Sequence, residues 1–242
     1  MKTLLLLSIF FSLWLSSIAQ AEDLSVLAPQ VSGLVEEDGT GAYQQVLREA
    51  AKRANLRFTE RFYPYKRALV LFEEHQGTCI YSPVDPFEES LGTNAILAST
   101  PLGGVRMHVF TRKGEPVITA ADQLKGKRVG GMIGLDSFYK DIIEHGAELD
   151  YVPADVQNVK KLQAGRIDAF IGALPDLNPV LEHLDYAPEY VLVESYDRIL
   201  CHNTITGAEF IKAISPVFES MKSDGTLAAL MGRHHLELRE AE

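Results

Sequence analysis

The chain has 242 residues, of which 46% are hydrophobic, and it carries a formal net charge of −10. This length allows one large domain or two smaller lobes, and the apolar fraction is that of an ordinary globular protein. The negative charge argues against nucleic acid and anionic membrane surfaces as partners, because both would repel the chain.

The first 21 residues have the pattern of a secretory signal peptide. Lys2 gives a positive start, residues 4–18 are almost entirely apolar, and residues 19–21 (Ala-Gln-Ala) match the small-x-small pattern that signal peptidase reads. The alternative is a membrane anchor, but the apolar stretch is shorter than the roughly 18–20 residues of a spanning helix. We therefore expect cleavage after Ala21 and export to the periplasm.

The first half of the mature chain alternates strand and helix patterns. Residues 24–28, 56–62 and 78–82 have patterns typical of strands, and residues 42–54 and 66–75 have apolar positions at helical spacing. Strands that alternate with helices in this way predict a parallel α/β sheet.

The same alternation restarts in the second half and ends in a helical tail. Thr206 and Glu209 form a predicted capping box at the start of this tail, and Pro216 lies inside its first helix. Two successive α/β halves predict two lobes with a cleft between them. Strands are expected over residues 105–111, 127–132, 149–152, 167–171, 190–193 and 198–201, and helices from Asp136 to Gly146, from Asp155 through Leu162 and from Pro175 to Leu184.

The two cysteines, Cys79 and Cys201, both lie in apolar, strand-like runs. An oxidising compartment permits a bridge, but two cysteines are too few for a disulfide framework. We expect two buried thiols. Neither the cysteines nor the seven histidines have metal-ligand spacing, so no metal site or cofactor is expected.

Four short motifs occur in the order and at the spacing of a known family. They resemble the P-x-x-R-A-L, L-K-G-K-x-V-G, L-x-x-G-R-x-D-A and D-G-x-L motifs of bacterial extracellular solute-binding proteins of family 3, which include periplasmic amino-acid-binding proteins. The matching stretches are Pro64-Tyr65-Lys66-Arg67-Ala68-Leu69, Leu124-Lys125-Gly126-Lys127-Arg128-Val129-Gly130, Leu162-Gln163-Ala164-Gly165-Arg166-Ile167-Asp168-Ala169 and Ser223-Asp224-Gly225-Thr226-Leu227.

The resemblance implies an α/β, two-lobed type II periplasmic-binding-protein fold with two hinge strands and a cleft between the lobes. Lobe 1 would comprise residues 22–108 and 202–242, and the inserted lobe 2 would comprise residues 109–201. A monomer of this kind closes on a small polar solute, such as an amino acid or a related small molecule, and performs no catalysis. Its partner would be an ABC permease or a membrane sensor.

The sequence departs from the family at the residues that hold an amino acid. Members that bind amino acids carry an Arg shortly after the third strand and an Asp just after the G-R-x-D-A strand. Here residues 82–89 contain no Arg, and Asp176 follows the strand three residues late. The identity of the ligand, and whether it is a free amino acid at all, therefore stay open.

Ligand contacts are expected where strands end and the next helices begin. Arg67 is the first candidate, because a guanidinium offers two parallel donors to a carboxylate or phosphate. Tyrosines at strand ends can stack on a ligand, whereas in a structural role they would pack in the core. The expected ligand-binding residues are Arg67, Tyr65, Tyr81, Ser82, Asp136, Ser137, Asp176 and Arg106.

An enzyme on the same scaffold, similar to cyclohexadienyl dehydratase, is the alternative function. A dehydratase needs a positioned general acid, and Glu88, Glu89 and Asp136 are the candidates, although their spacing marks no pair. No G-x-S-x-G motif or Gly-rich phosphate loop is present. A sensory partner with an empty cleft is the third possibility considered.

Overall fold

The structure is a computed structural model that describes residues 24–236, apart from the side chains of Glu88 and Glu89. The predicted signal peptide and its cleavage site lie outside the described residues. Within residues 24–236, no helix is long and apolar enough to cross a membrane.

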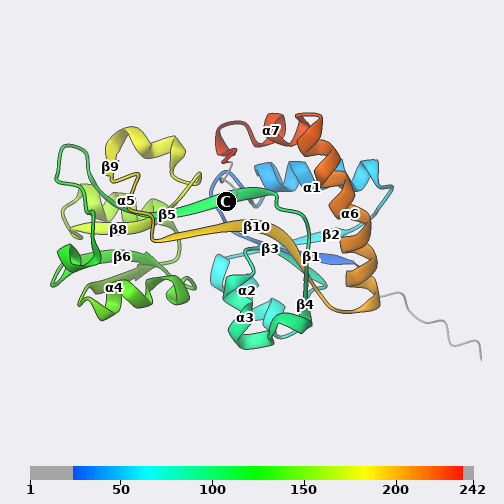
Figure 1. The fold of residues 1–242 in the computed structure, drawn as a ribbon, viewed down its shortest axis with the longest axis horizontal. Coiled ribbons are helices and arrows are strands. Elements are labelled where there is room, and N and C mark those ends of the chain that lie inside the picture. The colour runs from blue at the N-terminus through cyan, green and yellow to red at the C-terminus, as the bar shows by residue number, and fades with distance from the viewer. Residues whose placement is uncertain (1–23, 237–242) are drawn as a thin grey trace, which may run out of the picture.

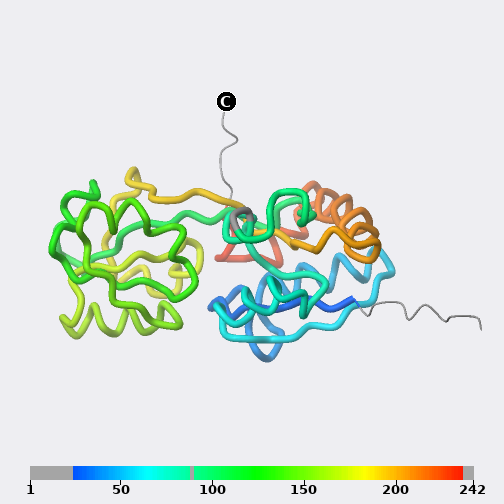
Figure 2. Tube along the Cα trace, turned by 90° about the horizontal axis from the view of Figure 1, so that it is seen from below, coloured from blue at the N-terminus to red at the C-terminus, as the bar shows by residue number. Residues whose placement is uncertain are grey.

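Two α/β lobes joined at a narrow waist make up an elongated molecule (Figures 1 and 2). Their strands form one continuous sheet in the order β2-β1-β3-β10-β5-β8-β6-β7, with β4 beside β10 and β9 beside β5. The predicted α/β class with two crossing strands is therefore confirmed.

The first lobe is built on three parallel strands with helices on both faces (Figure 1). Val26 and Ala28 pack toward α1, α6 and α7, whereas Leu27 packs toward α2, because successive strand residues point to opposite faces. Its elements are β1 (Ser25–Pro29), α1 (Ala42–Arg53), β2 (Thr59–Tyr63), α2 (Tyr65–Glu73), β3 (Cys79–Ser82), α3 (Asp85–Leu91), β4 (Ile96–Ala98), α6 (Ile205–Ser223) and α7 (Thr226–Met231).

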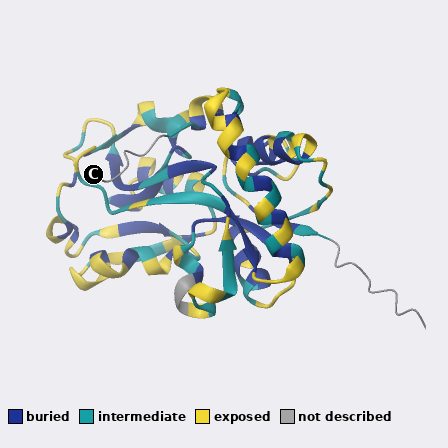
Figure 3. Cartoon of the chain, turned by 45° about the vertical axis from the view of Figure 1, so that its right-hand side comes forward, coloured by how far each residue is buried: buried dark blue, intermediate teal, exposed yellow. Residues whose placement is uncertain are grey.

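The second lobe repeats this design on a smaller scale. Strand β6 pairs in parallel with both β7 and β8, and β8 pairs antiparallel with β5. Figure 3 shows buried residues along the central strands and exposed residues on the outer faces of the helices. The elements are β5 (Gly103–Arg112), β6 (Arg128–Met132), α4 (Lys140–Glu144), β7 (Glu148–Val152), α5 (Asp155–Gln163), β8 (Ala169–Leu174) and β9 (Leu184–Tyr186).

Strands β5 and β10 (Val193–His202) run antiparallel across the waist and join the lobes. The first half of β10 pairs with β5 and its second half pairs with β3, so this strand belongs to both lobes. The strand expected over residues 198–201 is the second half of β10, whereas of the strand expected over residues 190–193 only Val193 is in β10 and the rest is irregular. One buried cluster, which includes Leu27 and Val129, runs through both lobes. The two cores are therefore in contact.

Two predictions about local structure, one of a helix and one of a helix cap, were wrong. The helix expected from Pro175 to Leu184 is only a 3₁₀ turn over Asn178–His183, and Pro179 lies in it without an N–H to donate. The tail helix α6 is capped by Thr204, whose hydroxyl accepts a hydrogen bond from the Gly207 N–H at 3.1 Å, rather than by the Thr206–Glu209 capping box.

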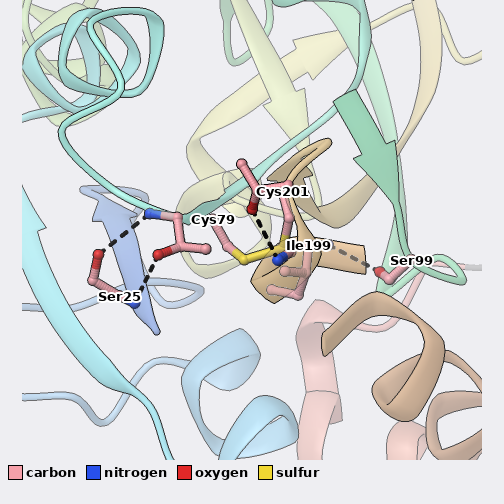
Figure 4. The surroundings of a disulfide bond; sticks show 8 residues. Ser25, Cys79, Ser99, Ile199 and Cys201 are labelled. Atoms are coloured by element: carbon pink, nitrogen blue, oxygen red, sulfur yellow. Dashed lines mark hydrogen bonds between the residues drawn. A yellow bond between two sulfur atoms is a disulfide. The ribbon is translucent and has the colours of Figure 1, made fainter. Parts of the chain in front are cut away.

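The expectation of two free thiols was also wrong, because Cys79 and Cys201 form a disulfide (Figure 4). The two residues lie directly opposite each other on antiparallel strands β3 and β10, with their Cα atoms 4.0 Å apart. Nearby, Ser99 Oγ accepts a hydrogen bond of 3.0 Å from the Ile199 N–H. The disulfide therefore ties the returning strand β10 to the first lobe.

Candidate ligand-binding cleft

A pocket of about 360 Å³ lies between the lobes, where strands β1, β6 and β8 end. This volume is in the range of small-molecule sites, and strand carboxyl ends are where open α/β sheets bind ligands. One wall is the segment after β1 in the first lobe, and the other comes from the second lobe. The lining includes Gln30, Val31, Ser32, Glu36, Met132, Asp155, Val156, Val159, Lys160, Asp176, Leu177 and Val180.

Asp176 follows β8 and contributes a buried carboxyl group to this pocket. Its Oδ1 atom is inaccessible to solvent and has no hydrogen-bond partner within residues 24–236. Burial, followed by the nearby carboxyl groups of Asp197 and Asp155, raises the pKa of Asp176 well above its ordinary value. The pocket thus contains a carboxyl group with one buried oxygen atom that accepts no hydrogen bond within the described chain.

Asp155 is the second carboxyl group of the pocket and begins helix α5. Its Oδ1 accepts a hydrogen bond of 3.2 Å from the Asn158 side-chain amide. Burial raises the pKa of Asp155 to about 6, and the bond from Asn158 offsets only part of that effect.

Asp197 brings a third carboxyl group to this region from the crossing strand β10. The Tyr43 hydroxyl donates a hydrogen bond of 2.7 Å to Asp197 Oδ2. Burial nevertheless raises the pKa of Asp197 to about 6. Tyr43 is only 2% exposed, so helix α1 holds this contact from inside the first lobe.

Tyr65 begins helix α2 and is 7% exposed, yet its hydroxyl makes no hydrogen bond to any described residue. Burial, Asp197, Asp176 and Tyr139 all raise the pKa of the Tyr65 phenol. The side chain therefore lies close to the carboxyl groups on β10 and after β8. Tyr65 and Asp176, both expected from the sequence, are brought together from opposite lobes.

Asp136 and Ser137, also expected, are exposed at the turn after β6. They line a smaller hollow of about 130 Å³, together with Lys66 and Phe87 of the first lobe. A Cβ atom added at Gly134 would lie 3.1 Å from Lys66 Cδ, so the two lobes approach closely here.

The other expected residues lie elsewhere. Arg67 is exposed on α2, and the Tyr81 hydroxyl donates to Glu60 beside Arg48. Arg106 Nε lies 2.5 Å from Glu194 Oε2, in an ion pair between the crossing strands. Ser82 is 2% exposed, and its Oγ has no partner among the described residues. Neither of the two hollows is lined by Arg67, Tyr81, Ser82 or Arg106.

The sequence-based reasoning missed Tyr43, Asp155 and Asp197 as residues of the cleft region. Asp155 was recognised only as a helix cap, although its place after a strand was a usable sign. Asp197 lies within a strand, and its neighbours in space depend on which strands β10 pairs with, which the sequence does not reveal.

Asp136, one of the three candidates for the general acid of a dehydratase, is not in a buried position among the described residues. Asp136 is exposed and lies near the Tyr151 hydroxyl. The side chains of Glu88 and Glu89 lie outside the described residues. In the described part of the chain, no group of three His, Cys, Asp or Glu residues is placed to hold a metal ion.

Solved structures of similar shape decide the fold. The L-glutamate complex of the GluR0 ligand-binding core from Nostoc punctiforme superposes with a TM-score of 0.73 at 18% identity, covering 87% of this chain and 98% of that one. This chain has the type II periplasmic-binding fold. A mutant of ArgBP from T. maritima gives a TM-score of 0.70 at 16% identity, covering 88% of this chain and 94% of that one.

A third solved structure of this fold is the amino acid ABC transporter substrate-binding protein AbpA from Streptococcus pneumoniae, bound to L-arginine. Its TM-score is 0.68 at 15% identity, covering 86% of this chain and 92% of that one. No protein-family model and no curated protein matches the sequence. At these identities the structural likeness establishes the fold, while the solute has to be argued from this chain's own cleft.

Proposed function

We propose that this chain is a periplasmic solute-binding protein that closes on a small polar solute and releases it chemically unchanged. The observation that carries this proposal is the pocket of about 360 Å³ whose walls come from both lobes. A ligand in such a pocket would contact both walls at once, and would therefore favour the closed arrangement of the lobes.

The neighbours and the sequence support the finer parts of the proposal. The GluR0 core and AbpA are bound to L-glutamate and L-arginine, respectively. We assign residues 22–108 and 202–242 to lobe 1 and residues 109–201 to lobe 2. Residues 1–21 would be a signal peptide cleaved after Ala21, and the monomeric mature protein would deliver its solute to an ABC permease or be read by a membrane sensor.

A thermal-shift screen of the purified mature protein tests this function. The screen covers amino acids, amines, carboxylates and small peptides. A ligand present at one hundred times its dissociation constant should add about 2.7 kcal/mol of stability. At least one class should raise the melting temperature, and mass spectrometry should recover that solute unchanged. Turnover of the solute, or no shift with any compound class, would contradict the proposal.

A further inference from the structure

We propose that the cleft is built for an organic cation, an amine or guanidine without a carboxylate, held by Asp176 and Asp155 with Tyr65 and Asp197 close by. The inference rests on the proposed solute-binding function and narrows it to one class of solute. This class of solute differs from the free amino acids bound in the similar structures.

The first step is the charge of the cleft. Asp176, Asp155 and Asp197 come from the end of β8, the start of α5 and the crossing strand β10. All three are shielded from water strongly enough that burial is the main cause of their raised pKa values. Ionised carboxylates in such surroundings are unfavourable unless a cation compensates them.

The second step is that, within residues 24–236, no basic side chain is paired with any of these three carboxyl groups. Lys160 is the basic side chain of the pocket lining; it is exposed, and its ammonium group forms no ion pair with Asp155 or Asp176. Arg67 is exposed, and Arg106 is already paired with Glu194. No Lys or Arg lowers the pKa of Asp155, Asp176 or Asp197.

The third step is that the Tyr65 hydroxyl and one oxygen atom of the Asp176 carboxyl group, which lie near each other, have no hydrogen-bond partner in the described chain. The Tyr65 hydroxyl lies in a side chain that is 93% buried, as its 7% exposure implies, and it makes no hydrogen bond within the described chain. Asp176 Oδ1 is itself inaccessible to solvent and has no hydrogen-bond partner among the described residues. An ammonium or guanidinium group carries several N–H donors, which would serve these two side chains from opposite lobes.

The remaining lining suits an apolar stem, and three carboxyl groups (Glu36, Asp155 and Asp176) face a single basic side chain, Lys160, around the pocket. Val31, Met132, Val159, Leu177 and Val180 line the pocket beside the acidic groups. A ligand carboxylate would enter a site that already contains buried carboxyl groups, and like charges repel strongly in such surroundings. An amine or guanidine on a methylene chain satisfies both features of the lining.

Isothermal titration calorimetry with two matched pairs of probes tests the inference. Cadaverine and L-lysine differ only by the α-carboxylate, and so do agmatine and L-arginine. In at least one pair, the amine should bind the mature protein at least tenfold more tightly than the amino acid. Glutarate, a dianion of similar length, should not bind.

Three variants connect this preference to the cleft. Asp176→Asn should weaken amine binding at least tenfold, and Tyr65→Phe, which removes only the unpaired hydroxyl, should weaken it severalfold. Asp122→Asn alters an exposed carboxylate near the amino end of β6 and should leave the affinity unchanged. Circular dichroism of each variant verifies folding, and Tyr65→Phe keeps the test valid if Asp176→Asn does not fold.

Several results would overturn the inference. Equal or tighter binding of both amino acids, or tighter binding of glutarate, would reject an organic cation while leaving solute binding intact. Failure of all five probes, when the thermal screen finds another solute, would have the same meaning. Unchanged amine affinity in both Asp176→Asn and Tyr65→Phe would remove these residues from the site. No shift in the screen and no binding of any probe would reject solute binding itself.

Discussion

Asp197 shows how one side chain can make stability depend on pH. Its folded-state pKa of about 6 lies above the ordinary value of 3.8, because burial opposes the charged form. An acid with a raised folded-state pKa contributes stability that is fully present below pH 4 and is lost as the pH rises through about 6. The apoprotein therefore loses part of its stability between pH 4 and pH 7 through this residue.

Asp197→Asn should remove that loss, because the amide oxygen can still accept the Tyr43 hydrogen bond. Relative to the wild type, the variant should gain about 1–3 kcal/mol between pH 4 and pH 7. Urea denaturation at a series of pH values measures this difference. A stability difference that does not change with pH would contradict the assignment.

Asp224→Asn is a control, because Asp224 should change the pH dependence of stability in the opposite direction to Asp197. Hydrogen bonds from Thr226 and Arg53 lower the pKa of Asp224 to about 2. The contribution of this exposed carboxylate is present above pH 4 and is lost as the pH falls through about 2. The variant should therefore be less stable than the wild type at pH 7, and the gap should narrow as the pH falls toward 2.

The sequence predicted the position of residues that directly follow a strand. Tyr65 and Asp176 follow strands, and sheet geometry alone brings such positions toward the cleft. Tyr81 also ends a strand, but which face of the sheet it lies on depends on the strand register, and its hydroxyl reaches Glu60 instead. Asp197 needed the pairing of β10, which is set by contacts far apart in the chain.

At the level of single elements, the start of helix α6 provides a test of local assignment. Thr204→Ala removes the hydroxyl that accepts from the Gly207 N–H, and should cost about 1 kcal/mol of unfolding free energy. Thr206→Ala is the matched control inside the first turn of the helix and should cost little. Thermal denaturation of both variants decides which threonine is the cap, and a larger loss for Thr206→Ala would restore the capping box expected from the sequence.

The pair of strands β3 and β10 carries the second prediction at this level. The disulfide joins residues 122 positions apart and closes a loop that contains the whole second lobe. The double variant Cys79→Ala, Cys201→Ala should lose about 2–5 kcal/mol, since the unfolded chain is no longer restricted. Guanidinium denaturation measures the loss, and a reductant should destabilise only the wild type. Equal stability of the two proteins would contradict the bridge.

Element types were more predictable than element boundaries. The helix predicted over residues 42–54 is α1, because apolar residues at helical spacing can be recognised in a short stretch of sequence. The helix predicted over residues 175–184 is a 3₁₀ turn that contains Pro179, and β10 begins at Val193 and includes residues 194–197, which the prediction left out of any strand. Strand continuity and the disulfide both depend on pairing over long sequence separations, so local patterns did not show them.

At the scale of the whole molecule, two features control how the lobes can move. Strands β5 and β10 form the only covalent connections of the described chain between the lobes, and both cross at the waist. A buried cluster continues from one lobe to the other, and Tyr65 of α2 lies near Gly134 of the facing turn. The described arrangement is therefore one in which the lobes touch, with the pocket between them.

Ligand-dependent closure can be measured as a distance across the mouth of the pocket. Glu37 and Gln157 are exposed and adjoin the lining residues Glu36 and Val156 on opposite walls. Both native cysteines are in the disulfide, so Glu37→Cys and Gln157→Cys can carry spin labels selectively. A second pair at Glu37 and Lys52, both in the first lobe, provides the control for changes within one lobe.

Pulsed electron–electron double resonance on the labelled protein, with and without the solute identified in the thermal screen, tests most directly whether the two lobes close on a ligand. We predict that the solute narrows the Glu37–Gln157 distance distribution and shifts it to shorter values, while the Glu37–Lys52 distribution stays unchanged. Identical Glu37–Gln157 distributions in the free and saturated protein would contradict a hinged pair of lobes that closes on its ligand.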